Sequence, residues 1–208
     1  MQSFTANKKS IVAIAVSAAL AASAGSAFAI SQSGEAKNMI RVGHTDLQGR
    51  PTYQPNVIQY PDGRTILFAG MHSGNPRPST CPANTLPNPL DGGACENNGT
   101  MIIDVTDVRN PVEKALIPAP TGGQAQMTRM CLGSQLLGGD PSKVYLLRNV
   151  QGSSQAGYQV YDVTDVQHHV LKAAVSGLRP AHKPGGDCTT GTMYAPASAC
   201  TAPPSRGP

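Results

Sequence analysis

The chain has 208 residues, of which 39% are hydrophobic and 13% charged, with 22 Gly, 18 Pro and no Trp. So much Gly and Pro without a collagen period, together with so few charges, excludes a coiled coil and a highly charged disordered chain. The length fits one ordinary domain or a piece of a larger β fold. The net charge of +4 is spread along the chain without a Lys/Arg block, so we expect no nucleic-acid partner.

The first thirty residues predict a cleaved signal peptide. Lys8 and Lys9 form a basic start, the apolar run Ile11–Leu20 follows, and Ala27–Ala29 supplies the small-x-small pattern of a cleavage site. The apolar run is too short to span a bilayer, so we expect cleavage after Ala29 and no stable membrane anchor in the mature protein. Residues 1–29 are thus expected to direct the chain to the periplasm or the medium.

All five cysteines lie after the predicted signal peptide, which favours disulfides in an oxidising compartment. Cys81 and Cys95 bracket a loop rich in Pro and Asn, and Cys131 and Cys188 would form a longer-range pair. An odd count leaves Cys200 over in this arrangement, although other connectivities remain open. A zinc site is less expected, because no two cysteines have the close spacing that such sites use.

The mature chain contains a repeat. Gly99–Val108 (GTMIIDVTDV) recurs 58 positions later as Gly157–Val166 (GYQVYDVTDV), with D-V-T-D-V in common. Each copy begins at Gly, continues through β-branched and aromatic residues and stops at Thr-Asp. This pattern predicts a strand that runs into a turn, because Asp side chains bind backbone amides two residues on.

Further strands are expected on both sides of each copy. Upstream they are residues 65–69 and 143–147, and downstream residues 114–117 and 171–175. The upstream strands are 78 positions apart (Ile66 to Val144), which is more than the repeat spacing, so the first copy has an insertion over about residues 75–96. No stretch keeps the helical apolar period over three turns without Gly or Pro.

Three short strands per copy, joined by turns and repeated with loop variation, predict an all-β fold of propeller-like blades. The alternative is a β-sandwich in which the repeat is a coincidence. Blades commonly take ~40–50 residues, so the mature chain has room for three or four of them. That number predicts an incomplete ring with an exposed strand edge.

Three segments resemble the bacterial exported LVIVD-repeat proteins. They are Asp46–Pro51, the run from Glu96 to Asp107, and Gly139–Arg148. The resemblance covers roughly residues 38–183. It implies a β-propeller built from repeats with the core I-x-D-V-[ST]-D-P-x-x-P, and it implies export, but it implies no reaction.

Two departures from that family stand out. Gln167–His169 occupies the place of the Asn110–Pro111 turn of the first copy. After His182–Lys183, where relatives have a Trp-rich strand, residues 184–208 are Gly-, Ala- and Pro-rich. This tail reads as low-complexity and disordered, with no strand, and predicts a truncation or frameshift near residue 184. The repeat region is thus expected to be residues 30–183.

Candidate chemistry is sparse. No nucleophile, phosphate-loop or calcium motif occurs, so no catalytic residue is predicted. Among the five histidines, His72 at a strand end and His182 between blades are the candidates for a metal site on a propeller axis. The competing interpretation is that these are surface or turn histidines with ordinary hydrogen bonds. The cofactor is unknown.

Two function classes follow. The first is an exported binding or scaffold protein that holds a protein or small-molecule ligand through variable loops such as residues 75–96. The second is a periplasmic metal-dependent enzyme that uses histidines at the propeller channel. The absence of a catalytic motif favours the first, because function depends on the site and not on the fold.

Overall fold

A computed structural model of the chain describes residues 40–74, 80–178 and 182–195. The chain divides into two units, Met1–Ile40 and Arg41–Pro208, and the account below concerns the second. The predicted signal peptide and Cys200 lie outside the described residues.

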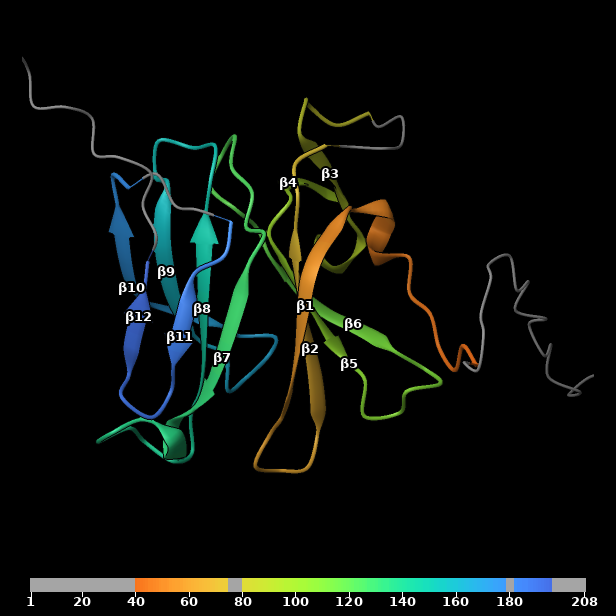
Figure 1. The fold of residues 1–208 in the computed structure, drawn as a ribbon. Helices are drawn as coiled ribbons and strands as arrows, with labels where there is room; N and C mark the ends of the chain where they lie inside the picture. Colours follow the sequence, from red (N-terminus) through yellow and green to blue (C-terminus); the bar gives the residue numbers. More distant parts are fainter. Residues whose placement is uncertain (1–39, 75–79, 179–181, 196–208) are drawn as a thin grey trace, which may run out of the picture. The chain divides into compact units, whose positions relative to one another are not determined.

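The first sheet is a four-stranded antiparallel meander (Figure 1). Its strands, in spatial order, are β1 (Thr52–Gln59), β2 (Thr65–Met71), β5 (Thr100–Asp104) and β6 (Val112–Ile117). The short 3-10 helix η1 (Leu47–Gly49) precedes it.

The second sheet repeats this plan with β7 (Thr128–Leu132), β8 (Val144–Val150), β9 (Gly157–Asp162) and β10 (Val170–Ser176). The 3-10 helix η3 (Gly133–Gln135) lies between its first two strands. The prediction of an all-β fold with propeller-like blades is confirmed, but each blade has four strands rather than three. β1 and β7 escaped prediction because neither alternates cleanly between apolar and polar residues.

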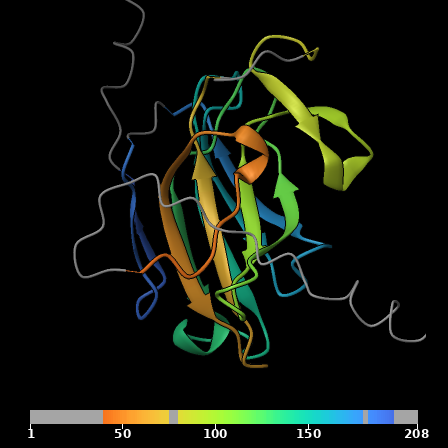
Figure 2. The ribbon, with the colours of Figure 1, turned by 90° about the vertical axis from the view of Figure 1, so that its right-hand side faces the viewer.

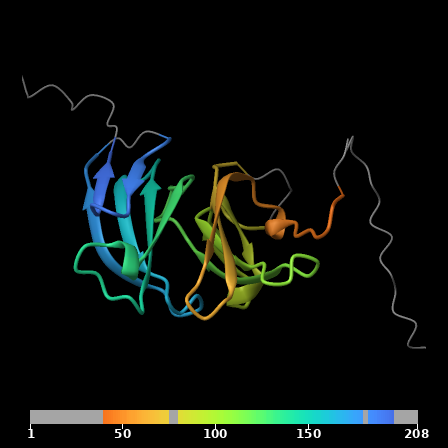
Figure 3. The same cartoon turned by 60° about the horizontal axis from the view of Figure 1, so that its bottom comes forward.

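The two sheets face each other across a common apolar core, and Figure 3 shows them as separate layers. The core is built from Tyr60, Ile66, Phe68, Ile102, Ala115 and Ile117 of the first sheet and Val144, Leu146, Tyr161, Val163 and Val166 of the second. The first strands of the two sheets also meet, because the Asn56 side chain in β1 donates to the Thr128 carbonyl in β7 at 2.8 Å. Within the described residues the blades do not close into a ring.

A buried arginine crosses the same interface. Arg148 in β8 is fully buried, and its guanidinium donates to the carbonyls of Ile117 (2.7 Å), the last residue of β6, and of Pro118 (2.9 Å), which follows it. It also donates to Gln159 Oε1 (2.8 and 3.0 Å) and to the Tyr161 hydroxyl (3.1 Å). Burial lowers the pKa of Arg148, because a charged group is disfavoured away from water. These bonds replace the hydration that the charge has lost and fasten the two sheets together.

The repeated aspartates form the turns that the sequence predicts. All four accept a backbone hydrogen bond from the residue two positions on, at 2.9 to 3.0 Å: Asp104 from Thr106, Asp107 from Arg109, Asp162 from Thr164 and Asp165 from Gln167. Each bond offers the backbone an alternative to the sheet ladder, so the strand ends there. These turns account for the repeated acids.

The threonine of D-V-T-D has a second function in both copies. Thr106 Oγ1 accepts the amide of Thr65, and Thr164 Oγ1 accepts the amide of Val144, both at 3.0 Å. Each bond fixes the first residue of the neighbouring strand. It also corrects the sequence alignment by one residue, because Thr65 and not Ile66 is the counterpart of Val144.

The glycine that opens each copy is required by a close backbone approach. A Cβ on Gly99 would lie 1.9 Å from the carbonyl oxygen of Ile117, and one on Gly157 would lie 1.8 Å from that of Val175. These carbonyls belong to the fourth strand of each sheet, at matching positions. The glycines therefore let the third and fourth strands approach each other in both blades.

The insertion in the first copy is a separate hairpin of β3 (Thr85–Asn88) and β4 (Ala94–Asn97), joined through the 3-10 helix η2 (Pro89–Asp91). Figure 2 shows it projecting from the first sheet. The disulfide Cys81–Cys95 closes it, in agreement with the pairing proposed above.

Arg50 anchors this hairpin to the sheet. The side chain is 3% exposed and donates to the Leu86 carbonyl (2.8 Å), the Glu96 carbonyl (3.1 Å) and Asn98 Oδ1 (2.9 Å). Burial lowers its pKa, although the charges of Glu96 and Glu113 oppose this shift. The insertion is thus fixed by a buried cation as well as by its disulfide.

The prediction that no strand follows residue 183 is wrong for the described part of the tail. Gly185–Asp187 (β11) and Thr192–Tyr194 (β12) form an antiparallel hairpin. The disulfide Cys131–Cys188 ties this hairpin to β7, which is the longer-range pair proposed above. The Gly-Gly pair hid the strand, because glycine carries no side chain with which to show a strand pattern. Residues 196–208 lie outside the described part.

Candidate functional site

The outer face of the second sheet, turned away from the first sheet, carries a pocket of about 350 Å³. We call it the outer-face pocket and define it by its lining residues: Arg129, Cys131, Leu136, Tyr145, Leu147, Val160, Gly186, Asp187, Gly191, Thr192 and Met193. One wall is the sheet, from β7 to β9, and the other is the β11–β12 hairpin. Most of the lining is apolar, which is typical of sites that hold a ligand by burial.

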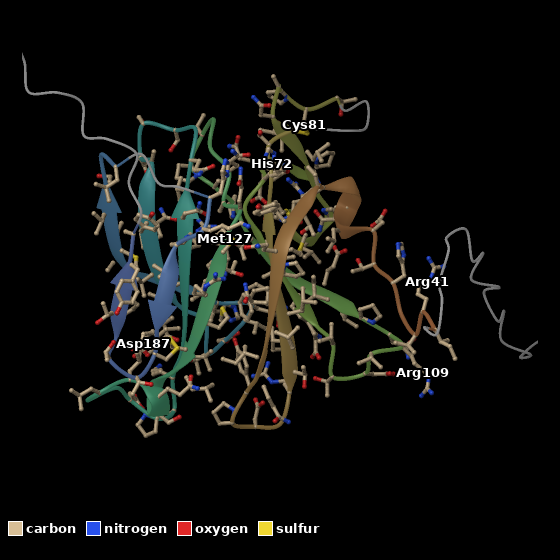
Figure 4. The ribbon with its side chains drawn as sticks, viewed as in Figure 1. Arg41, His72, Cys81, Arg109, Met127 and Asp187 are labelled. Carbon is tan, nitrogen blue, oxygen red and sulfur yellow. A yellow bond between two sulfur atoms is a disulfide. The ribbon has the colours of Figure 1, made fainter. Side chains whose placement is uncertain are left out.

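The hairpin wall is held in place at its turn. Asp187 accepts hydrogen bonds from the Thr190 hydroxyl and the Thr189 amide, both at 2.9 Å. The bond from the Thr190 side chain, followed by that from the Thr189 amide, keeps the pKa of the Asp187 carboxyl below its usual range. Figure 4 shows Asp187 at this turn, so an ionised carboxylate marks one border of the pocket.

Two charged side chains of opposite sign line the pocket. Arg129 Nη1 donates to the Thr128 carbonyl at 3.0 Å, and its guanidinium has further donors that can meet an acceptor. Asp187 can accept from a partner's amide or hydroxyl. A few polar groups in an apolar pocket fix the orientation of what binds there.

The structure does not gather the candidate metal ligands. His72 is exposed, with Nδ1 at 3.0 Å from the Ser73 carbonyl oxygen, and lies toward the end of the molecule that carries Cys81 (Figure 4). His182 is also exposed, with Nδ1 at 2.7 Å from Gln126 Oε1. Among the described residues no group of three or more His, Cys, Asp or Glu side chains is arranged to hold a metal ion.

The Gln126 side chain next to His182 is fully buried, and its Nε2 has no hydrogen-bond partner among the described residues. The contact between His182 and Gln126 ties the chain that enters the hairpin to the segment just before β7.

A smaller, polar hollow of about 220 Å³ lies beside the insertion. Its lining includes Ser73, Asn84, Asn98 and Gln124 together with glycines. The Asn98 amide already donates to the carbonyls of His72 (2.7 Å) and Gly74 (3.2 Å). Of the loop 75–96 that the sequence favours for ligand binding, residues 75–79 lie outside the described part and the remainder forms the anchored hairpin.

The outer-face pocket was missed in the sequence, although a signal for it exists. Tyr145, Leu147 and Val160 are the repeat counterparts of Ile66, Phe68 and Ile102, which pack in the core between the sheets. A correct alignment of the two copies would have marked them as a second packing face.

No family model matches the chain, and neither a curated protein nor a solved structure matches it. The resemblance to the LVIVD-repeat proteins therefore stays a prediction. Among the described residues no helix is long and apolar enough to cross a bilayer.

Proposed function

We propose that the chain is an exported, propeller-like binding module of the LVIVD-repeat type, which holds a protein partner or a small molecule in the outer-face pocket. The observation that carries the proposal is this pocket, whose apolar walls come from β7–β9 and from a hairpin tethered by a disulfide. Its volume lies within the range of roughly 300–1,000 Å³ that is usual for ligand sites.

Export is supported by the leader pattern of residues 1–29 and by the two disulfides, because such bonds persist in oxidising compartments. The Cys131–Cys188 bond also serves the site directly. It joins the two walls of the pocket, so the pocket is expected to keep its shape before a ligand arrives.

The test uses the fluorescent probe anilinonaphthalene sulfonate, whose aromatic rings suit the apolar walls and whose sulfonate can meet Arg129, away from the Asp187 carboxylate at the border. We expect saturable binding to the full chain, weakened about tenfold or more by Leu147→Asn, which removes an apolar wall. Val57→Asn, at an exposed position of β1, is the matched control and should leave binding unchanged. Equal binding by the Leu147→Asn variant and the unaltered chain would refute the proposal.

A further inference from the structure

The backbone register identifies which residues of the two sheets are equivalent. In the first sheet Phe68 pairs with Ile102, two residues before Asp104. In the second sheet Leu147 pairs with Val160, two residues before Asp162. Because the two aspartates are the same position of the repeat, Phe68 corresponds to Leu147 and Ile102 to Val160.

Equivalent faces have unequal neighbours. Phe68 and Ile102 are fully buried, and the second sheet covers them with apolar side chains from β8 and β9, Leu146 and Tyr161 among them. Their counterparts in the second sheet are only half-buried and line the outer-face pocket. The two faces are equivalent by sequence and register, but among the described residues the face of the second sheet is only partly covered by a neighbouring element.

The β11–β12 hairpin provides the first part of the missing cover. We call the contact between the first and second sheets the first interface, and the contact between the second sheet and this hairpin the second interface. In the first interface, the Thr128 carbonyl of β7 accepts from the Asn56 side chain at 2.8 Å, and the Thr128 hydroxyl donates to the Phe68 carbonyl at 3.5 Å. In the second, a Cβ on Gly186 of β11 would lie 3.6 Å from the Arg129 side chain and 3.9 Å from Leu147.

Arg129 pairs with Leu147 as Asn56 pairs with Phe68, and Thr128 and Gly186 are separated by the repeat spacing of 58 positions. β11 therefore has the place of the first strand of a blade, as β7 has in the second sheet. β12, which pairs with β11 as β8 pairs with β7, has the place of the second strand.

The third position is where the two interfaces differ. The second edge of β8 is paired with β9, whereas within the described residues β12 pairs with β11 alone. Tyr161 of β9 extends from that third position into the first interface. The corresponding space in the second interface is the outer-face pocket.

We propose that the edge of β12 that is unpaired within the described residues takes up an extended segment of a partner protein as a third, antiparallel strand, whose apolar side chains fill the outer-face pocket. This inference rests on the proposed function, since it names the partner of the same pocket. Main-chain hydrogen bonds to β12 provide affinity, and alternate side chains provide specificity.

The repeat itself describes the segment that fits. Its third strand has the sequence T-M-I-I-D in one copy and G-Y-Q-V-Y-D in the other. The residue before the aspartate has to be large and apolar, because Tyr161 at that place packs into the core between the sheets. Proline is excluded inside the segment, because it cannot donate to the ladder.

The probe is a synthetic peptide with the sequence of residues 157–166, added to the full chain. Amide hydrogen exchange at the β12 residues whose N–H points away from β11 should slow by about tenfold or more at saturating peptide, because paired amides exchange only when the pairing opens. The peptide with Val160→Pro should give no slowing. The peptide with Tyr161→Asn should bind about tenfold more weakly, because it loses the apolar anchor.

Three outcomes would overturn the inference. The first is unchanged exchange at these β12 amides with a bound peptide, and the second is slowing confined to the edge strands of the two sheets, β1, β6, β7 and β10. The third is exchange at these amides that is already slow in the free chain and indifferent to the peptide, which would mean that this edge of β12 is already occupied. If anilinonaphthalene sulfonate binds in the pocket while the peptide does not, only the strand inference fails. If neither binds, the proposed function fails as well.

Discussion

The two sheets share a repeat and a strand order, but they differ in what surrounds them. The face of the first sheet that carries Ile66 and Phe68 is closed by a complete neighbouring sheet. Among the described residues, the equivalent face of the second sheet, with Tyr145 and Leu147, meets a two-stranded hairpin in place of a complete sheet. The repeat therefore determines the strands and their turns, whereas the neighbouring element determines whether a face becomes core or lines a pocket.

The largest effect on stability is expected at the interface between the first and second sheets. Arg148→Ala should lower the free energy of unfolding by about 3–5 kcal/mol, because it leaves the buried carbonyl of Ile117 and the partly buried carbonyl of Pro118 without their donor. Urea denaturation measures this. Arg109→Ala, at an exposed arginine, should change stability by less than ~0.5 kcal/mol. Equal effects of the two substitutions would show that Arg148 does not join the sheets.

A smaller effect, equal in the two sheets, is expected at the glycines that open the repeat. Gly99→Ala and Gly157→Ala should each cost about 1–3 kcal/mol, because the new Cβ meets a backbone carbonyl that must shift. Gly186→Ala should cost far less, since a Cβ there makes only ordinary contacts. Thermal unfolding compares the three variants. A large cost at Gly99 together with none at Gly157 would contradict the equivalence of the two blades.

The smallest effect concerns a position where the copies differ, with Pro111 in the first and His169 in the second. Burial lowers the pKa of His169, and the positive charges of Arg148 and His168 lower it further. The unfolded chain therefore takes up a proton below about pH 6.5 that the folded chain resists, so stability is full above this pH and falls as the pH drops through it.

His169→Gln should flatten the dependence of unfolding free energy on pH between neutral and mildly acidic conditions. His168→Gln, at the exposed neighbour, is the control for a substitution in the same turn. An unchanged pH profile in the His169→Gln variant would exclude His169 as the source.

The sequence predicted the elements whose residues alternate or turn in a recognisable way. The strands around both D-V-T-D-V copies, their Asp turns and the cysteine pairs are of this kind. β1 and β7, the first strand of each sheet, were missed because they mix polar and apolar residues without a regular period. The hairpin after residue 183 was missed because its first strand begins with two glycines.

The candidate site could be predicted less well than the fold. His72 and His182 were selected by residue type, but convergence of ligands depends on tertiary placement that spacing alone does not contain. The outer-face pocket depends on which face of a repeated strand lacks a complete neighbour. That property belongs to the arrangement of blades and not to any local motif.

The threonine of D-V-T-D bonds the first residue of a strand that lies earlier in the chain. This bond forms whether the intervening connection is the short turn between β8 and β9 or the long hairpin between β2 and β5. Closing a longer loop costs only a logarithmic increment of entropy. The threonine bond can therefore hold the same strand register whether the connection is short or long. The connection between the second and third strands is therefore the place where a blade of this type can accept new segments during evolution without losing its sheet.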